Sequence, residues 1–378
     1  MKHALNFNQY KRLQKDSIQA LVAMSLLISP HIKADESLSY QSGITLIHQH
    51  SFNKQIKPDT SLSADLGLYY TTQQGQWHLH LEASTAPSKN GVAAQIIDSN
   101  ADAGSSLNNR DQGRIQVSEL HYLFRATKHL QLTTGLLDAT SYLDTANIMN
   151  DENQNFISPS LVNNPVIDFP DYVIGVSMAY QLTAKLTSRL FVSSTHGLAD
   201  NNSRNYSSLF EVNEDEKGIF SAFELGYAVN QSFINIGVWL HSGQHQALDD
   251  SNNNDLSNYG SYLSTGLSKD NHQYEMRFGI ANPDVSAASQ FVSAAYQYST
   301  EDWDLGVGLS STALSSKLQN DATSPAQTAE LYWQRRLNKN WQITPSVQWF
   351  KNPFYESTSQ ALSDEVMTAN LRISYAFE

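Results

Sequence analysis

The chain has 378 residues, of which 24 are Lys or Arg and 37 are Asp or Glu, and its formal net charge at pH 7 is −13. This acidic balance disfavours binding to nucleic acid, whose phosphates need basic partners. The chain has no Cys, which excludes disulfides, thiolate chemistry and Cys-based zinc sites. No shift in composition and no linker divides the sequence, so a single large domain is expected.

The N-terminus predicts a secretory signal peptide over residues 1–34. Basic residues precede an apolar run over 18–28, and the small residue Ala34 follows it at the expected cleavage position. The alternative is an amphipathic helix that stays in the mature protein. Removal of 1–34 takes away five Lys or Arg and one Asp, so that residues 35–378 keep 19 basic and 36 acidic residues, a net charge of −17.

Apolar and polar residues then alternate in sixteen segments, each close to the 9–11 residues of a tilted membrane-spanning strand. None of them approaches the roughly 18 consecutive apolar residues of a membrane helix. In the last segment Met367, Leu371 and Phe377 belong to the apolar register, which alternates with polar residues. The pattern predicts an all-β fold, a transmembrane up-and-down antiparallel β-barrel over 35–378. The predicted strands are 42–50, 62–72, 75–84, 115–125, 128–137, 172–181, 184–195, 218–229, 232–242, 257–267, 271–280, 290–299, 302–311, 326–336, 340–350 and 366–377.

The links between these segments alternate in length. Seven links of two or three residues alternate with eight longer ones, many of them rich in Asn, Asp and Ser. We therefore expect short periplasmic turns, long external loops and both termini in the periplasm. A β-propeller or a large sandwich is the soluble alternative, but a propeller motif repeating every 40–50 residues is not found. Trp77, Trp303 and Trp341 lie at strand ends, as in the aromatic girdles of membrane barrels.

If the apolar register faces lipid, the residues between face a water-filled lumen. This register gives candidates of both charge signs for lining the pore and binding substrate. Carboxylates accept hydrogen bonds from the hydroxyl groups of a solute, the five donors of Arg bind hydroxyl oxygens, and aromatic rings stack on apolar faces. The simpler interpretation is that any water-filled pore needs a polar wall, and a single dominant sign would indicate ion selectivity instead. The candidates are Glu82, Glu119, His121, Arg189, Trp239, Glu275, Arg277, Glu330, Tyr332 and Arg336.

The link over 138–171 is long enough to expect a function for it. Its apolar residues and its three prolines argue against disorder. We expect it to fold inward and narrow the pore, and a lid on the outer rim is the alternative. Its candidate constriction residues are Asp138, Asp144, Asp151 and Glu152.

Two blocks of sequence carry a family resemblance. The first contains Gly-Leu-Leu-Asp at 135–138 and Leu-Val-Asn-Asn-Pro at 161–165, and the second contains Trp-Gln-Ile-Thr-Pro at 341–345 followed by the terminal strand at 371–377. Both are similar to the carbohydrate-selective (OprB-like) porins of Gram-negative outer membranes. The resemblance implies a sixteen-stranded pore that passes sugars by passive diffusion. The chain departs from that family in ending on Glu378 after the aromatic Phe377.

No catalytic motif is present: His-Glu-x-x-His, Gly-x-Ser-x-Gly and the P-loop are all missing, so no enzyme activity and no cofactor is predicted. No metal site is predicted either, because His78 and His80 share a strand face without partners visible in the sequence. The alternatives to a sugar porin are a general or cation-preferring porin and a surface receptor or adhesin. Expected partners are small sugars and other small hydrophilic solutes, outer-membrane lipids and the barrel-assembly machinery, with a homotrimer left open.

Overall fold

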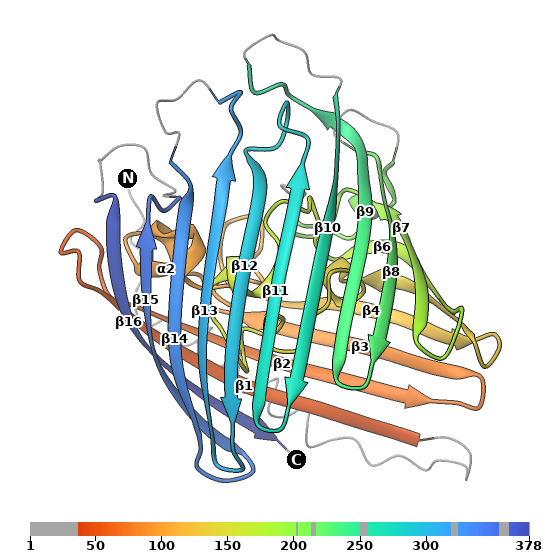
Figure 1. Cartoon of the computed structure of the whole chain (residues 1–378), viewed down its shortest axis with the longest axis horizontal. Coiled ribbons are helices and arrows are strands. Elements are labelled where there is room, and N and C mark those ends of the chain that lie inside the picture. Colours follow the sequence, from red (N-terminus) through yellow and green to blue (C-terminus); the bar gives the residue numbers. More distant parts are fainter. Residues whose placement is uncertain are drawn as a thin grey trace, which may run out of the picture.

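The computed structural model describes residues 37–201, 203–212, 217–249, 256–318, 324–354 and 363–377. In these residues sixteen antiparallel strands form one closed barrel (Figure 1), which confirms the predicted fold class. The predicted signal peptide lies outside the described residues. The strands are β1 (Ser37–Ser51), β2 (Asp59–Thr71), β3 (Gly75–Ser84), β4 (Ile115–Arg125), β5 (Leu130–Leu137), β6 (Val173–Gln181), β7 (Leu186–Ser194), β8 (Ile219–Val229), β9 (Ser232–His245), β10 (Leu256–Lys269), β11 (His272–Ala281), β12 (Ala288–Ser299), β13 (Trp303–Leu314), β14 (Ala326–Arg336), β15 (Trp341–Lys351) and β16 (Glu365–Phe377).

Each strand pairs with its neighbours in sequence, and β1 closes the ring on β16, with Ile44 opposite Tyr375. Because the ring is closed, each of the described strands has a partner strand on both sides, and a sheet in lipid requires such closure. The short turns and the long loops alternate as predicted. In the two-residue turns after β8 and β10, Asn230 and Asp270 have φ values of 54° and 52°, the backbone region that tight hairpins favour.

The outer face of the barrel is apolar. In β9, Ile234, Ile236 and Val238 are exposed, whereas the alternating residues Gly237 and Trp239 are buried inside. Exposed apolar side chains recur in this way on successive strands, and a continuous apolar band of this kind is the lipid-facing surface of a membrane barrel. The predicted inward and outward register is therefore confirmed. Within the described ranges, every helix is too short and too polar to cross a membrane.

The short helices belong to the links between strands. They are α2 (Val92–Gln95) and η1 (Ile97–Ser99) between β3 and β4, η2 (Ala139–Ser141) and α3 (Pro159–Val162) between β5 and β6, and η3 (Ser207–Phe210) between β7 and β8. We call residues 138–172, which join β5 to β6, the inner loop.

The link between β3 and β4, residues 85–114, also enters the barrel. Asn100 Nδ2 donates to Oε1 of Gln49 on β1 at 3.0 Å, and Nε2 of Gln348 on β15 donates to the backbone oxygen of Ser99 at 3.0 Å. The expectation that this link lies wholly outside the cell is therefore wrong for its central part. The side-chain amides of Gln49 and Gln348 on the wall are buried and need hydrogen-bond partners. Asn100 and Ser99 of the link supply these partners, so this part of the link is held inside the barrel.

Candidate functional site

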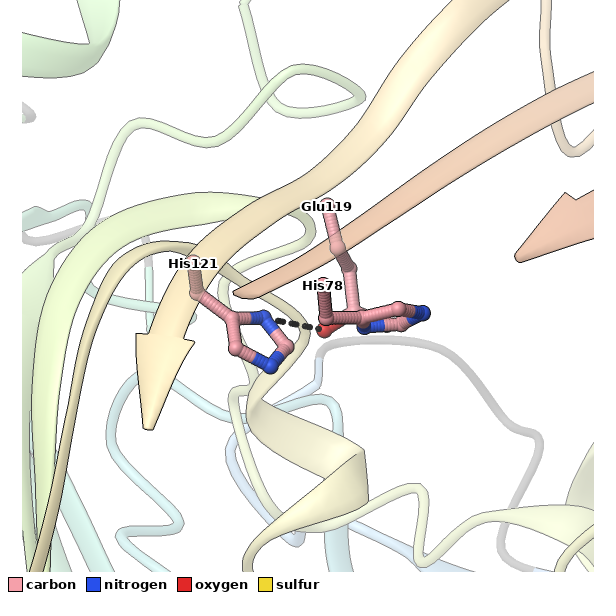
Figure 2. A group of neighbouring side chains, drawn as sticks. All are labelled: His78, Glu119 and His121. Atoms are coloured by element: carbon pink, nitrogen blue, oxygen red, sulfur yellow. Dashed lines mark ion pairs between the residues drawn. The ribbon is translucent and has the colours of Figure 1, made fainter. Parts of the chain in front are cut away.

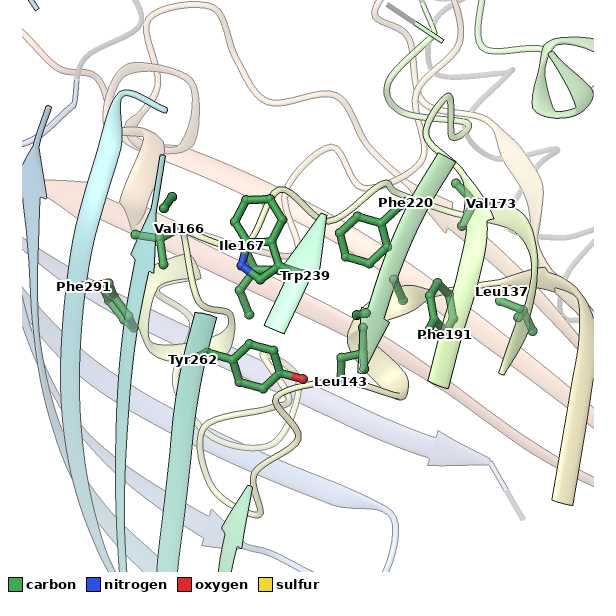
Figure 3. Packing of buried hydrophobic residues seen from close by; sticks show 13 residues of the cluster. Leu137, Leu143, Val166, Ile167, Val173, Phe191, Phe220, Trp239, Tyr262 and Phe291 are labelled. Atoms are coloured by element: carbon green, nitrogen blue, oxygen red, sulfur yellow. The ribbon is translucent and has the colours of Figure 1, made fainter. Parts of the chain in front are cut away.

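The inner loop folds into the lumen, as the sequence predicts. Its residues Leu143, Val166 and Ile167 pack against inward-facing aromatic side chains of the wall (Figure 3). These aromatic residues lie on β7 to β12 and are Phe191, Phe220, Trp239, Tyr262 and Phe291. Full burial of each large apolar side chain contributes about 1.5–3 kcal/mol, so this packing is a strong reason for the inward fold.

A second apolar contact lies further along the inner loop. Phe156 and Leu161 pack with Tyr332 of β14 in another buried cluster. The wall makes room for them at Gly308 of β13, where a Cβ atom would lie 2.8 Å from Leu161 Cδ1 and 2.9 Å from Phe156 Cε1. A larger residue at this position would push the loop away from the wall.

Charged side chains of the wall bind the backbone of the inner loop. The carboxylate of Glu275 on β11 accepts hydrogen bonds from three consecutive N–H groups, those of Asn147 at 2.6 Å and of Ile148 and Met149 at 3.0 Å. Hydrogen bonds from backbone N–H groups to a carboxylate are strong. Here they also give partners to N–H groups of the loop that form no hydrogen bond to a neighbouring strand. Glu275 thus fixes the middle of the loop.

Other wall residues hold the remaining parts of the loop. Glu330 on β14 accepts from the N–H groups of Ile157 at 3.1 Å and Ser158 at 3.0 Å. Arg372 on β16 donates to the backbone oxygens of Glu152 at 2.5 Å, Gln154 at 3.0 Å and Asn155 at 2.9 Å. The backbone of the loop is therefore attached to β11, β14 and β16.

These contacts decide where the predicted pore-lining residues lie. Trp239, Glu275, Arg277, Glu330 and Tyr332 point inward as predicted, but they are buried beneath the inner loop. Arg189 pairs with Glu224 of the adjacent strand at 2.5 Å. Arg336 pairs with Asp304 at 2.5 Å and donates to the backbone oxygen of Thr300, next to a short turn. Binding of solute by these residues stays a prediction, while the structure gives several of them a role in holding the loop.

An open cavity of about 900 Å³ remains on the other side of the inner loop. Asn150, Asp151 and Glu152 of the loop line it on one side. Inward residues of β1, β2, β3, β4 and β16 also line the cavity, together with Asn340 of the β14–β15 turn. The cavity therefore extends toward the end of the barrel that carries the short turns, which is the periplasmic end of such barrels. Its wall includes Tyr40, Thr45, Asp65, Tyr69, His78, His80, Glu82, Glu119, Ser374 and Tyr375.

Acidic residues dominate this cavity. Of the predicted candidates, Glu82, Glu119, Asp138, Asp151 and Glu152 line it, whereas Asp144 is turned toward Arg277 under the loop. Among the described lining residues eight are Asp or Glu, and Lys339 is the one Lys or Arg. The expected lining of mixed sign is therefore not what surrounds the cavity, because Arg277 and Arg372 donate to the inner loop instead.

Three of the acidic residues that the links contribute to the cavity have raised pKa values. Burial, together with the nearby charges of Asp102 and Asp151, raises the pKa of Glu152 to about 8. Burial likewise raises the pKa of Asp102 to about 7 and, with the charge of Glu119, that of Asp138 to about 6. The negative charge of the cavity therefore changes over the physiological pH range.

Sequence reasoning missed Asp65, Tyr69 and Asp102 as lining residues. Asp65 and Tyr69 lie on β2. Both alternate with the outward-facing residues of this strand, so the sequence pattern could have identified them as inward-facing. Asp102 follows η1 in the irregular link before β4, and no periodicity in the sequence marks it.

A closed sixteen-stranded barrel with an apolar outer face and a polar cavity beside an inward loop defines a porin-type channel. Residues 128–377 match the model of the carbohydrate-selective porin family, OprB, and the chain belongs to this family. It is 28% identical over 196 residues to an uncharacterized protein of Aquifex aeolicus (strain VF5), a match over 47% of this chain. That match spans 60% of the relative's length.

Solved porins share the fold at low sequence identity. OprB of Pseudomonas putida, in a structure at high pH, is 11% identical with a TM-score of 0.66, covering 91% of this chain and 94% of that one. OmpF of Salmonella typhi, in complex with daunomycin, is 12% identical with a TM-score of 0.62, covering 92% and 99%. OmpT of Vibrio cholerae is 9% identical with a TM-score of 0.57, covering 93% and 100%. Porins of this fold are typically channels that catalyse no reaction.

Proposed function

We propose that this protein is an outer-membrane porin through which small hydrophilic solutes diffuse passively, with a preference for carbohydrates. The observation that carries the proposal is the polar cavity between the inner loop and β1 to β3. Membership of the carbohydrate-selective family supports the preference. No step in this function requires a cofactor or a chemical reaction.

The lining chemistry suits sugars. Carboxylates such as Glu82 and Asp151 accept hydrogen bonds from hydroxyl groups, and side-chain amides such as Asn150 both donate and accept. The ring of Tyr69 also lines the cavity and stacks on His78 at 4.5 Å, so its orientation is fixed. An aromatic face held in this way is available to the C–H surface of a sugar ring.

A cation-preferring general porin is the second candidate. It is favoured by the excess of carboxylates over Lys and Arg in the described part of the lining. One dominant sign of charge along a pore attracts ions of the opposite sign. Neutral sugars and cations can share one pore, so the two candidates differ in whether sugar competes with the ion current.

Export and assembly follow from the same proposal. Residues 1–34 would direct secretion, and the barrel of 35–378 would enter the outer membrane through the barrel-assembly machinery and contact its lipids. A structure of the Vibrio cholerae OmpT barrel is described as a trimer form, with a TM-score of 0.55, which supports a homotrimer as the form to test.

Planar bilayer recordings test the function directly. With purified protein in a salt gradient, added neutral monosaccharides should reduce the ion current, and Tyr69→Ala should weaken that reduction. Tyr259→Ala is the matched control, because Tyr259 is exposed on the outer face of β10. Strong cation preference without an effect of sugar would favour the general porin. A protein that folds but conducts no ions would contradict both candidates.

A further inference from the structure

Three side chains from two adjacent strands meet on the inner face of the barrel (Figure 2). His78 comes from β3, and Glu119 and His121 come from β4. The strand register places His78 directly opposite His121 and His80 opposite Glu119. One ligand atom from each of the three side chains lies within 4.8 Å of the other two.

Two of these side chains have buried nitrogen atoms that lack a hydrogen-bond partner within the described part of the chain. They are His78 Nε2 and His121 Nδ1. His121 Nδ1 lies 3.4 Å from Glu119 Oε2, an ion-pair distance outside hydrogen-bond geometry. The adjacent His80 differs, because its Nε2 contacts Asp65 Oδ1 at 3.2 Å. Buried polar atoms nearly always have a partner in the protein, a water molecule or an ion.

We propose that His78, Glu119 and His121 bind a divalent transition-metal ion with the coordination chemistry of Zn²⁺. Two imidazoles and one carboxylate form a known set of three protein ligands for Zn²⁺, with the fourth position open to water. Ligand bonds of about 2.0–2.1 Å in a tetrahedron place ligand atoms roughly 3.3 Å apart. The Glu119–His121 distance of 3.4 Å already matches this spacing, and the ligand atom of His78 lies within 4.8 Å of both.

Neighbouring groups support this arrangement. Tyr69 stacks on His78 with an interplanar angle of 6°, so the plane of the imidazole ring is defined by its neighbour. The β3–β4 pairing is irregular just beyond His80, and such bulges re-aim side chains near functional sites. His78 and Glu119 both line the cavity, so an ion from solution can reach them.

The second group of possible ligands, Asp168, His241 and His245, is a weaker candidate. Its ligand atoms also lie within 4.8 Å of one another. However, Asp168 Oδ2 already contacts His245 Nε2 at 2.9 Å and accepts from Asn258 Nδ2 at 3.0 Å. These contacts satisfy the carboxylate without a metal, so this group serves as a control.

Metal binding is tested on the folded mature protein in detergent, prepared without a polyhistidine tag and stripped with EDTA. Titration with ZnCl₂ against a chromogenic chelator should show saturable binding. His121→Ala and Glu119→Gln should each weaken the affinity at least tenfold, whereas the double variant His241→Ala/His245→Ala should keep it. Heat-dependent gel migration reports whether each variant folds. If His121→Ala does not fold, the near-isosteric Glu119→Gln still tests the site.

Two results would overturn the proposal: no saturable binding of Zn²⁺, or an affinity unchanged in Glu119→Gln and lost only in the His241/His245 variant. A second readout is the ion current, and this readout alone rests on the proposed function. A bound divalent cation would offset nearby carboxylates, so Zn²⁺ should reduce cation preference in the unmodified protein and not in Glu119→Gln. If Zn²⁺ binds but does not change cation preference, the metal site stands and the proposed conduction through this cavity is contradicted.

Discussion

Arg277 of β11 and Asp144 of the inner loop form a buried pair, with Arg277 Nε 3.4 Å from Asp144 Oδ2. The same guanidinium donates to the backbone oxygens of Val162 at 2.6 Å and Asp144 at 2.9 Å. One wall residue therefore joins the two ends of the loop segment between Asp144 and Val162. Arg277 points into the barrel, but it holds the inner loop in place and is not among the residues that line the cavity.

Arg277→Ala should loosen the inner loop. It leaves a buried carboxylate and two carbonyl oxygens unpaired, and removing one member of a buried ion pair costs about 3–5 kcal/mol. We expect a lower free energy of unfolding in urea and a larger, noisier single-channel conductance. The measurements are urea titration followed by gel migration, and bilayer recording.

Arg335→Ala is the control for that substitution. Arg335 pairs with Asp302 at 3.6 Å, and the two side chains are 39% and 70% exposed to solvent. Exposed pairs contribute about 0–1 kcal/mol, so this variant should resemble the unmodified protein. Equal destabilisation by both substitutions would contradict the role given to Arg277.

Ile236→Arg tests the lipid-facing register. Ile236 is exposed on the outer face in the middle of β9, and Arg near the bilayer midplane costs about 2–4 kcal/mol. The fraction of folded barrel in vesicles should fall. Phe52→Arg places the same charge at an exposed apolar residue in the link after β1 and should fold normally. Similar losses in both variants would show that the outer band is not in lipid.

Ion selectivity should depend on pH near neutrality. As pH falls, Glu152, Asp102 and Asp138 bind protons in turn, because their pKa values are raised to about 8, 7 and 6. Each proton removes negative charge from the cavity, so cation preference should decline from pH 8 to pH 6. Reversal potentials in a salt gradient measure this decline. Glu152→Gln should remove its upper part, and a flat profile in the unmodified protein would contradict the assignment.

The strands of the barrel wall could be predicted because the alternation of apolar and polar residues is visible within each short segment of sequence. Alternation along each strand, as in Ile234, Ile236 and Val238, reflects lipid on one face and the lumen on the other. Alternation also placed Glu275 and Arg277 on the correct face. Strand number and topology follow from counting such segments and comparing the lengths of their links.

The partners of the inward side chains were not predictable in the same way. Glu275 binds the backbone of Ile148, which lies 127 positions away in sequence, and no periodicity relates the two residues. For the same reason the sequence showed no partner for His78, although His121 faces it across the β3–β4 pairing. Apolar residues in the inner loop indicated that it packs against something, and only the fold identifies the strands concerned.

The path of solutes is tested most directly by blocking it at one chosen residue. Because the chain has no Cys, a single introduced thiol can be labelled with a bulky methanethiosulfonate reagent. Ser374→Cys places the thiol in the cavity, whereas Ser293→Cys places it on the inner face of β12 beside Met149 of the inner loop. Labelling at 374 should greatly reduce both the conductance and the uptake of neutral sugars by liposomes, and the Ser293→Cys protein should be unaffected by the reagent. Unchanged sugar uptake after complete labelling at 374 would contradict diffusion through this cavity.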